Sequence, residues 1–205
     1  FTRTLKKDAR PFNTEPEVLC CPADGKVLVY NHLGDNAALP IKGQHVRVDT
    51  LIACSETAAR YTQGSALIVR LAPYDYHRYH FFDTGHAGSA NTINGQYHSV
   101  NPIALAQNPT IFALNKRAIT TVDSATFGAV CCIEIGALNV SSIVQTYAPG
   151  PVQRGQEKGF FQFGGSTLVL LFPANTVTFD EDLLADSDTG IEVHVRAGER
   201  VGLRA

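Results

Sequence analysis

Long apolar runs and export signals are missing from this sequence. No window approaches the roughly 18 uninterrupted apolar residues that a membrane-spanning helix needs. The opening stretch, Phe1-Thr-Arg-Thr-Leu-Lys-Lys-Asp8, also lacks the apolar segment of a signal peptide. We therefore expect neither a membrane-spanning helix nor an export signal in these residues. The start without Met leaves room for an upstream targeting segment that has been removed.

An excess of positive charge is missing as well. The chain has 17 lysines and arginines against 19 acidic residues, which gives a net charge of −2, and it contains no lysine-rich stripe. A protein that binds nucleic acid usually presents a basic patch to the phosphates. We therefore expect no nucleic-acid partner.

Cysteine spacings typical of metal sites are absent. Four of the five cysteines form the vicinal pairs Cys20-Cys21 and Cys131-Cys132 in apolar sequence, and no C-x-x-C spacing occurs. Vicinal cysteines fit the geometry of a disulfide poorly. We predict buried, reduced thiols rather than disulfides or metal ligands.

Helix signals are few, whereas short β-type runs recur between turn signals. Helices are expected over residues 49–61 and 102–107, the second with proline in its first turn. Strands are expected over residues 26–30, 66–71, 118–122, 129–135, 142–147, 168–172 and 191–195. The continuous apolar runs predict central strands, and the alternation in the last run predicts one buried face. Without a composition shift along the chain, this pattern indicates a single β-rich α+β domain over residues 1–205.

The segment Gly164-Gly165-Ser166-Thr167, just before the expected strand 168–172, has two interpretations. Two glycines can take backbone conformations that would turn the Gly165 carbonyl toward the Ser166 hydroxyl. If that serine attacks the carbonyl, the chain cuts itself. The alternative is an ordinary glycine turn that enters a strand with a capping serine, and the motif alone leaves both open.

Three histidines lie close together in the sequence, at His77, His80 and His86. Such a set could indicate zinc, but His86 falls in an expected loop, and a zinc ligand needs defined support. We therefore expect no metal and favour a catalytic base or a structural histidine.

Asp24 in Pro22-Ala-Asp-Gly25 also has two interpretations. The pair Asp24-Gly25 can open a hairpin. A histidine base, however, works best when a carboxylate fixes its tautomer. Asp24, one of the histidines and Ser166 could therefore serve as acid, base and nucleophile.

Ordered motifs along nearly the whole chain resemble one family. They are Phe1-Thr-Arg3, Ala9-Arg-Pro11, Pro22-Ala-Asp-Gly25, Ile41-Lys-Gly-Gln44, Asp75-Tyr-His-Arg-Tyr-His80, Ser99-Val-Asn-Pro102, Asn115-Lys-Arg117, Gly136-Ala-Leu-Asn-Val140, residues 158–167 and residues 190–202. The sequence resembles the catalytic domain of phosphatidylserine decarboxylase, a pyruvoyl-dependent lyase made as a self-cleaving zymogen. The form Phe163-Gly-Gly-Ser-Thr167 is similar to the branch with a glycine pair at the cleavage site.

The resemblance implies roles for individual residues. Asp24, His80 and Ser166 match the self-processing triad, in which Ser166 attacks the carbonyl of Gly165. The ester then undergoes β-elimination, and Ser166 becomes a pyruvoyl group that forms a Schiff base with the substrate. His77 matches the histidine that handles the substrate carboxylate and delivers a proton. Cleavage would leave a β chain, residues 1–165, and an α chain, residues 166–205, associated as a heterodimer.

The resemblance also implies substrate and location. The expected reaction is decarboxylation of phosphatidylserine to phosphatidylethanolamine in phospholipid biosynthesis, by a domain associated peripherally with a membrane surface. Homodimerisation stays open. Phe81, Phe82, Phe160 and Phe161 could touch the membrane or pack in the core.

Two alternatives are kept. One is a pyruvoyl-dependent decarboxylase of a free amino acid. The other is a non-catalytic module of the biotinyl or lipoyl type, because residues 152–159 and 195–202 resemble the paired turns of such folds.

Overall fold

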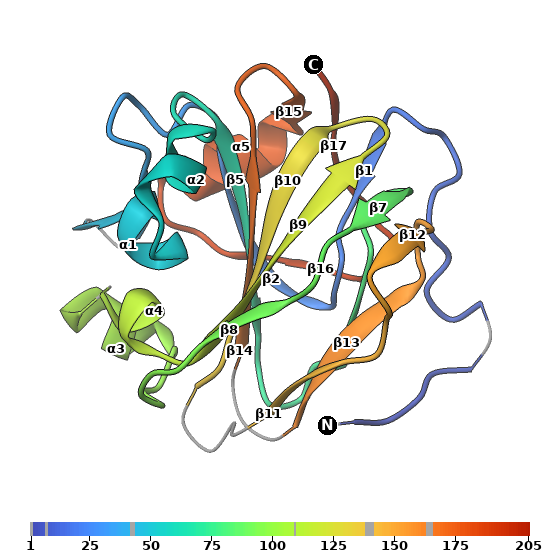
Figure 1. Cartoon of the computed structure of the whole chain (residues 1–205), viewed down its shortest axis with the longest axis horizontal. Coiled ribbons are helices and arrows are strands. Elements are labelled where there is room, and N and C mark those ends of the chain that lie inside the picture. Colours follow the sequence, from blue (N-terminus) through green and yellow to red (C-terminus); the bar gives the residue numbers. More distant parts are fainter. Residues whose placement is uncertain (1, 7, 42–43, 109, 138–141, 163–165) are drawn as a thin grey trace.

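An antiparallel sheet runs through the centre of the protein (Figure 1). The computed structural model describes residues 2–6, 8–41, 44–108, 110–137, 142–162 and 166–205. Among these, nine strands form the central sheet in the order β12-β7-β9-β10-β14-β5-β2-β16, with β8 paired to β9. They are β2 (Gly25–Tyr30), β5 (Ser65–Leu71), β7 (Gly85–Ala87), β8 (Asn91–Ile93), β9 (Arg117–Ser124), β10 (Gly128–Ile135), β12 (Gly150–Val152), β14 (Ser166–Phe172) and β16 (Val193–Val195).

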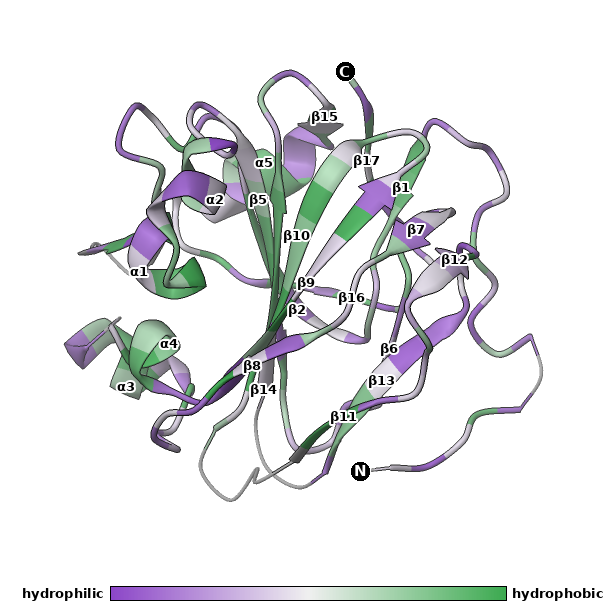
Figure 2. Cartoon of the chain, in the orientation of Figure 1, coloured by the Kyte–Doolittle hydropathy of each residue, from purple (hydrophilic) through white to green (hydrophobic). Residues whose placement is uncertain are grey.

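Smaller sheets and short helices cover the two faces of the central sheet. The smaller sheets are β1 (Val18–Cys20), β17 (Arg200–Arg204) and β15 (Val177–Phe179); β11 (Ser142–Gln145), β13 (Glu157–Gln162) and β6 (Arg78–His80); and β3 (Ala38–Ile41) with β4 (Gln44–Arg47). The helices are α1 (Val48–Ile52), α2 (Ser55–Ala59), α3 (Pro102–Gln107), α4 (Ile111–Leu114) and α5 (Glu181–Asp188). In Figure 1, α1 to α4 lie on one side of the sheet and β11 and β13 on the other, and Figure 2 labels β6 beside β13 in the same orientation.

Apolar side chains fill both spaces beside the central sheet. Successive residues of β14 point to opposite faces. Leu168 therefore packs with Tyr79 and Phe161 under the small sheet, while Val169 packs with Phe112 under the helices. Figure 2 shows apolar residues along β5, β10 and β14. Burial on both faces explains why these strands read as continuous apolar runs.

The expected α+β class, rich in β structure, is confirmed, and each expected strand is found with adjusted ends. The single helix expected over residues 49–61 is wrong. Ala53 takes a left-handed conformation with φ 58° and ends α1, and extended Cys54 begins α2. The helix expected over residues 102–107 is confirmed as Pro102–Gln107. The Asn101 side chain stabilises its start by accepting a hydrogen bond from the Ala104 N–H.

The prediction of buried free thiols is confirmed for Cys20, Cys21, Cys131 and Cys132, whereas Cys54 is free but exposed. Phe81, Phe82 and Phe161 are at most 1% exposed and pack in the core, which decides against membrane contact for these three. Phe160 instead lies under the Arg78 guanidinium, 4.9 Å from the ring centroid. No described helix has both the length and the hydrophobicity to cross a membrane.

Residues 166–205 are distributed over two sheets. Strand β14 lies between β10 and β5 in the centre of the main sheet, and β16 forms one edge of it. Strands β15 and β17 join β1 in a separate sheet. The prediction that residues 168–172 and 191–195 share a core with the preceding chain is therefore confirmed.

Arg117 joins the helices to the start of β9. It is 4% exposed, and its guanidinium donates hydrogen bonds to the carbonyls of Leu51 at 2.6 Å, Ala113 at 2.6 Å, Asn115 at 3.1 Å and Thr50 at 3.2 Å. These contacts hold α1 and α4 against the sheet.

The Arg117→Met substitution should lower the free energy of unfolding by about 2–4 kcal/mol, since buried carbonyls would lose their charged donor. Urea denaturation measures this change. Arg60 is exposed, so Arg60→Met is the matched control and should leave the midpoint nearly unchanged. Equal effects of the two substitutions would contradict the assignment.

Candidate active site

Ser166 is the first residue of β14 and pairs with Leu71 of β5. Its side chain is fully buried, and its Oγ has no hydrogen-bond partner among the residues the structure describes. Strand alternation places it on the same face as Leu168, toward the small sheet that contains β6 and β13. No capping hydrogen bond of Ser166 is found among the described residues. Gly164 and Gly165 lie outside the described residues.

His77 lies beside the chain that leads to Ser166. It is buried, and its Nδ1 is 2.8 Å from the carbonyl oxygen of Asp75. The His77 carbonyl accepts a hydrogen bond of 3.0 Å from the N–H of Phe161, five residues before Ser166. The loop 72–77 thus follows Leu71, which pairs with Ser166 in the sheet, and it ends at His77, beside β13.

His80 ends β6 and faces Glu157 across the ladder. Its Nδ1 is 3.0 Å from the carbonyl oxygen of Gly155, so Nδ1 carries the proton. Nε2 is then the acceptor, 3.4 Å from the Tyr76 hydroxyl. Burial lowers the pKa of His80, and this effect outweighs the Gly155 carbonyl and the charges of Glu157 and Asp24, which raise it. The imidazole is therefore neutral at neutral pH, with Nε2 able to accept a proton.

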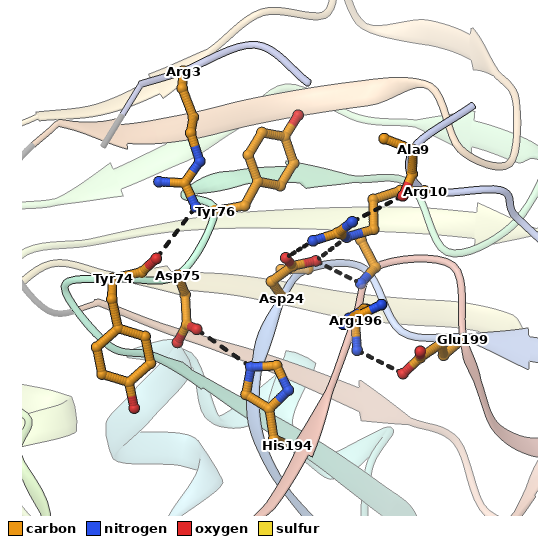
Figure 3. Close-up of polar contacts among 12 residues, drawn as sticks. Arg3, Ala9, Arg10, Asp24, Tyr74, Asp75, Tyr76, His194, Arg196 and Glu199 are labelled. Atoms are coloured by element: carbon orange, nitrogen blue, oxygen red, sulfur yellow. Dashed lines mark hydrogen bonds and ion pairs between the residues drawn. The ribbon is translucent and has the colours of Figure 1, made fainter. Parts of the chain in front are cut away.

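Asp24 is held by Arg10 and by a backbone amide (Figure 3). Arg10 donates from Nε to Oδ1 at 2.8 Å and from Nη2 to Oδ2 at 2.5 Å, and the Ala197 N–H donates to Oδ1 at 2.9 Å. Burial alone would raise the pKa of Asp24, but these hydrogen bonds and the Arg10 charge lower it below its usual value. Asp24 is therefore ionised at neutral pH.

The structure gives Asp24 and His80 different partners from those expected. Asp24 binds Arg10 and Ala197, whereas Nδ1 of His80 faces Gly155. Asp24 is still close enough for its charge to favour protonated His80.

The hairpin interpretation of Asp24-Gly25 is wrong, because β1 pairs with β17 and β2 with β5 and β16. The sequence did not predict that Arg10 pairs with Asp24, although Ala9-Arg-Pro11 was one of the motifs.

Two equivalent turns support this site, at residues 153–156 and 196–199. We call them the twin turns. Each has a glycine with positive φ, Gly155 at 79° and Gly198 at 87°. Each turn also exchanges two backbone hydrogen bonds with the residue that follows a strand. In the first turn, the Gly155 N–H donates to the Phe81 carbonyl at 2.8 Å, and the Phe81 N–H donates to the Gln156 carbonyl at 2.8 Å. In the second turn, the Gly198 N–H donates to the Cys21 carbonyl at 2.9 Å, and the Cys21 N–H donates to the Glu199 carbonyl at 2.8 Å.

The twin turns position the two titratable groups. The first turn supplies the Gly155 carbonyl that contacts His80, and the second supplies the Ala197 N–H that binds Asp24. A further hydrogen bond of 2.8 Å, from the His80 N–H to the Pro22 carbonyl, joins the two halves. The similarity between residues 152–159 and 195–202 therefore reflects equivalent structure.

Asp75 and His86 lie outside this arrangement. Asp75 Oδ2 accepts a 2.7 Å hydrogen bond from the Ala72 N–H, and Oδ1 is 3.3 Å from His194 Nε2, so Asp75 closes its own loop. His86 is on β7, and the expectation that it lies in a loop is wrong. Within the described ranges, no three His, Cys, Asp or Glu side chains gather as a metal-binding set.

The structure therefore places the buried Ser166 and the histidine-bearing strand β6 on the same face of the central sheet. Comparisons with known proteins identify the family. The sequence model of phosphatidylserine decarboxylase matches residues 1–203. Phosphatidylserine decarboxylase proenzymes are similar over nearly the whole chain: 47% identity in Chlamydia muridarum, over 100% of this chain and 68% of the relative; 45% in Clostridium botulinum strain Langeland, over 98% and 69%; and 43% in Ruminiclostridium cellulolyticum, over 98% and 68%.

The chain belongs to the phosphatidylserine decarboxylase family. Membership supports an enzyme, and specifically a decarboxylase.

Proposed function

We propose that the protein is a pyruvoyl-dependent phosphatidylserine decarboxylase that makes its prosthetic group from Ser166. The observation that carries this proposal is the fully buried Ser166 hydroxyl, which has no hydrogen-bond partner among the described residues. Leaving a buried hydroxyl unsatisfied costs roughly 1–3 kcal/mol. Thr167 Oγ1 is also unpartnered among the described residues but points to the opposite face of the sheet. Ser166 differs in facing the small sheet that contains β6 and in directly following the Gly165 carbonyl. Relatives named phosphatidylserine decarboxylase proenzyme support the substrate and the proenzyme state.

Maturation begins with attack of Ser166 Oγ on the Gly165 carbonyl carbon. The C–N bond breaks, the nitrogen of Ser166 takes the proton from the hydroxyl, and an ester joins Gly165 to the Ser166 side chain. Removal of the Ser166 Cα proton then expels the Gly165 carboxylate and leaves a dehydroalanine. Addition of water and loss of ammonia convert it to the pyruvoyl group.

His80 and Asp24 supply the proton chemistry of maturation. We assign Nε2 of His80 as the acceptor of the Ser166 hydroxyl proton, because Nδ1–H is already bound to the Gly155 carbonyl. The two side chains are not hydrogen-bonded in this structure, so the transfer requires them to approach each other. The ionised Asp24 stabilises the imidazolium by its charge across the space between them, since its own hydrogen bonds go to Arg10 and Ala197. This role of Asp24 is electrostatic rather than a direct contact.

The buried, unpartnered Ser166 hydroxyl and the nearby buried His77 support a pyruvoyl group at this position in the mature enzyme. That group supplies an electron sink for loss of carbon dioxide. His77 is buried on the segment that faces β13, where it would hold the substrate carboxylate and return a proton to the product carbon. Positioned proton transfer of this kind is worth about 10²–10⁴ in rate.

The proposal includes the molecular form of the enzyme. Residues 1–205 form one catalytic domain, cleaved into a β chain, residues 1–165, and an α chain, residues 166–205. The shared sheets keep the two chains together as a heterodimer. The mature enzyme works at a membrane surface as a peripheral protein.

A test of the substrate uses processed protein with phosphatidylserine vesicles and free amino acids supplied separately. Phosphatidylethanolamine is the expected product. Release of a free amine from an amino acid, without turnover of vesicles, would favour the decarboxylase of free amino acids.

The carrier module finds no support, because residues 153–156 and 196–199 contain no lysine at which a carrier group could attach.

The two histidines should have separable effects. His80→Ala should stop self-cleavage, because the base for the Ser166 hydroxyl is lost. His77→Ala should cleave but decarboxylate about 10²–10⁴ times more slowly. Cleavage is followed by denaturing gel and decarboxylation by carbon dioxide release. Full activity of either variant in its own assay would contradict the role assigned to that histidine.

A further inference from the structure

The segment 9–12, which we call the N-terminal strap, contacts both titratable groups of the site. Arg10 binds both oxygens of Asp24 (Figure 3). The ring of Phe12 lies 5.7 Å from the ring of His80, centroid to centroid. One short segment therefore touches the carboxylate and the base.

The strap is packed tightly between the twin turns. A Cβ added at Gly155 would lie 3.2 Å from the Phe12 ring, and one added at Gly198 would lie 2.3 Å from the Pro11 carbonyl oxygen. The two turns that support His80 and Asp24 therefore also fix the strap between them.

Residues just before the strap bind the loop that carries His77. Arg3 donates to the Tyr74 carbonyl at 3.2 Å (Figure 3). Arg78 donates to the carbonyls of Thr2 at 3.0 Å and Arg3 at 3.2 Å. The amino-terminal residues thus reach from the His77 loop to Asp24.

The Arg10–Asp24 pair differs from ordinary surface ion pairs, which contribute little. Its side chains are 23% and 6% exposed, compared with 50% and 23% for Arg200 and Asp180. The guanidinium fork binds both carboxylate oxygens, which fixes the orientation of the carboxylate as well as its charge.

We propose that Arg10 is a positioning residue for self-cleavage at Ser166, which together with Phe12 fixes the Asp24 carboxylate relative to the His80 ring. This inference rests on the proposed function. Arg10 touches no reacting atom and acts through Asp24.

The proposal predicts a change in pH dependence. Without Arg10, burial raises the pKa of Asp24, and the carboxylate is protonated at higher pH than in the wild type. Because the ionised form is required, the step in the cleavage rate that reports Asp24 should move up by about 1–3 pH units, toward the step at which His80 loses its proton. The other titratable and charged groups near Asp24 and its arginine are Cys21, Tyr76, His80, His194 and Glu199.

The experiment follows cleavage of freshly translated full chain between pH 5 and pH 8. Arg10→Ala should cleave about 10- to 100-fold more slowly near pH 6 and recover partly at higher pH. Arg10→Lys keeps the charge but not the fork, so its rate should be intermediate. Arg200→Ala removes a more exposed ion pair and should match the wild type in rate and profile.

A folding control separates positioning from stability. Each substitution is repeated in the Ser166→Ala protein, and circular dichroism and thermal unfolding are measured. If Arg10→Ala fails to fold, the profile of Arg10→Lys decides.

The proposal is overturned if both Arg10 variants cleave like the wild type. It is also overturned if both are slowed equally at every pH, which would indicate a structural role alone. An uncleaved wild type would instead remove the proposed function itself, together with this inference.

Discussion

The Ser166→Ala protein is expected to remain one 22.1 kDa chain, whereas the wild type separates into two pieces on a denaturing gel. The smaller piece, residues 166–205, is about one fifth of the chain and should lack a free amino terminus. Without the hydroxyl, no atom at position 166 can attack the Gly165 carbonyl, so cleavage and decarboxylation are lost together. Intact-mass analysis and reaction with a carbonyl reagent measure the outcome.

Thr167 offers a matched control for this experiment. Its Oγ1 is also buried and has no hydrogen-bond partner among the described residues, but strand alternation directs it to the opposite face of the sheet. Thr167→Val should therefore still cleave. A wild-type chain that stays whole and shows no carbonyl reactivity would falsify the self-cleavage proposal.

The second large effect is expected at Lys158, whose ammonium is buried between the central sheet and β11 and β13. Nζ is 2.7 Å from Glu134 Oε1, 3.1 Å from Thr120 Oγ1 and 2.9 Å from Gln145 Oε1. The Lys158 and Glu134 side chains are 3% and 1% exposed. Lys158→Met should lower the free energy of unfolding by about 3–5 kcal/mol, because the Glu134 charge loses its partner.

The pH dependence of this loss follows from Glu134. Burial raises the pKa of its carboxyl even with Lys158 present, and removal of Lys158 raises it further. A raised folded pKa makes stability fall as the pH rises above the unfolded value of about 4.3. Urea denaturation of uncleaved Ser166→Ala protein at several pH values should show a penalty that grows with pH.

Two comparisons make the Lys158 result interpretable. The double variant Glu134→Gln/Lys158→Met should lose less stability than Lys158→Met alone, because no charge stays buried. Arg47 belongs to an exposed ion pair, so Arg47→Met should leave the urea midpoint nearly unchanged. A Lys158→Met protein as stable as the wild type would contradict the ion-pair account.

Central strands were predictable because their pattern is local. The run 168–172 is apolar at every position, and the structure places it between two other strands. Short strands such as β7 and β12, with three residues each, were missed because their pairing depends on distant segments. The end of α1 was missed because Ala53, rather than glycine, takes the left-handed conformation.

The candidate site was predictable as a set of residues but not as a set of contacts. Asp24, His77, His80 and Ser166 could be selected from motifs and residue chemistry, and their assigned roles stay predictions. The pairing of Asp24 with Arg10, 14 positions earlier, needs the folded chain, since no local spacing indicates it.

The distribution of residues 166–205 over two sheets changes how a mature molecule responds to denaturant. If the chain is cleaved before Ser166 as proposed, unfolding releases two polypeptides, and the two must associate again before β14 can return to the central sheet. Renaturation then becomes a second-order process that depends on protein concentration, whereas the uncut Ser166→Ala chain renatures in a unimolecular reaction.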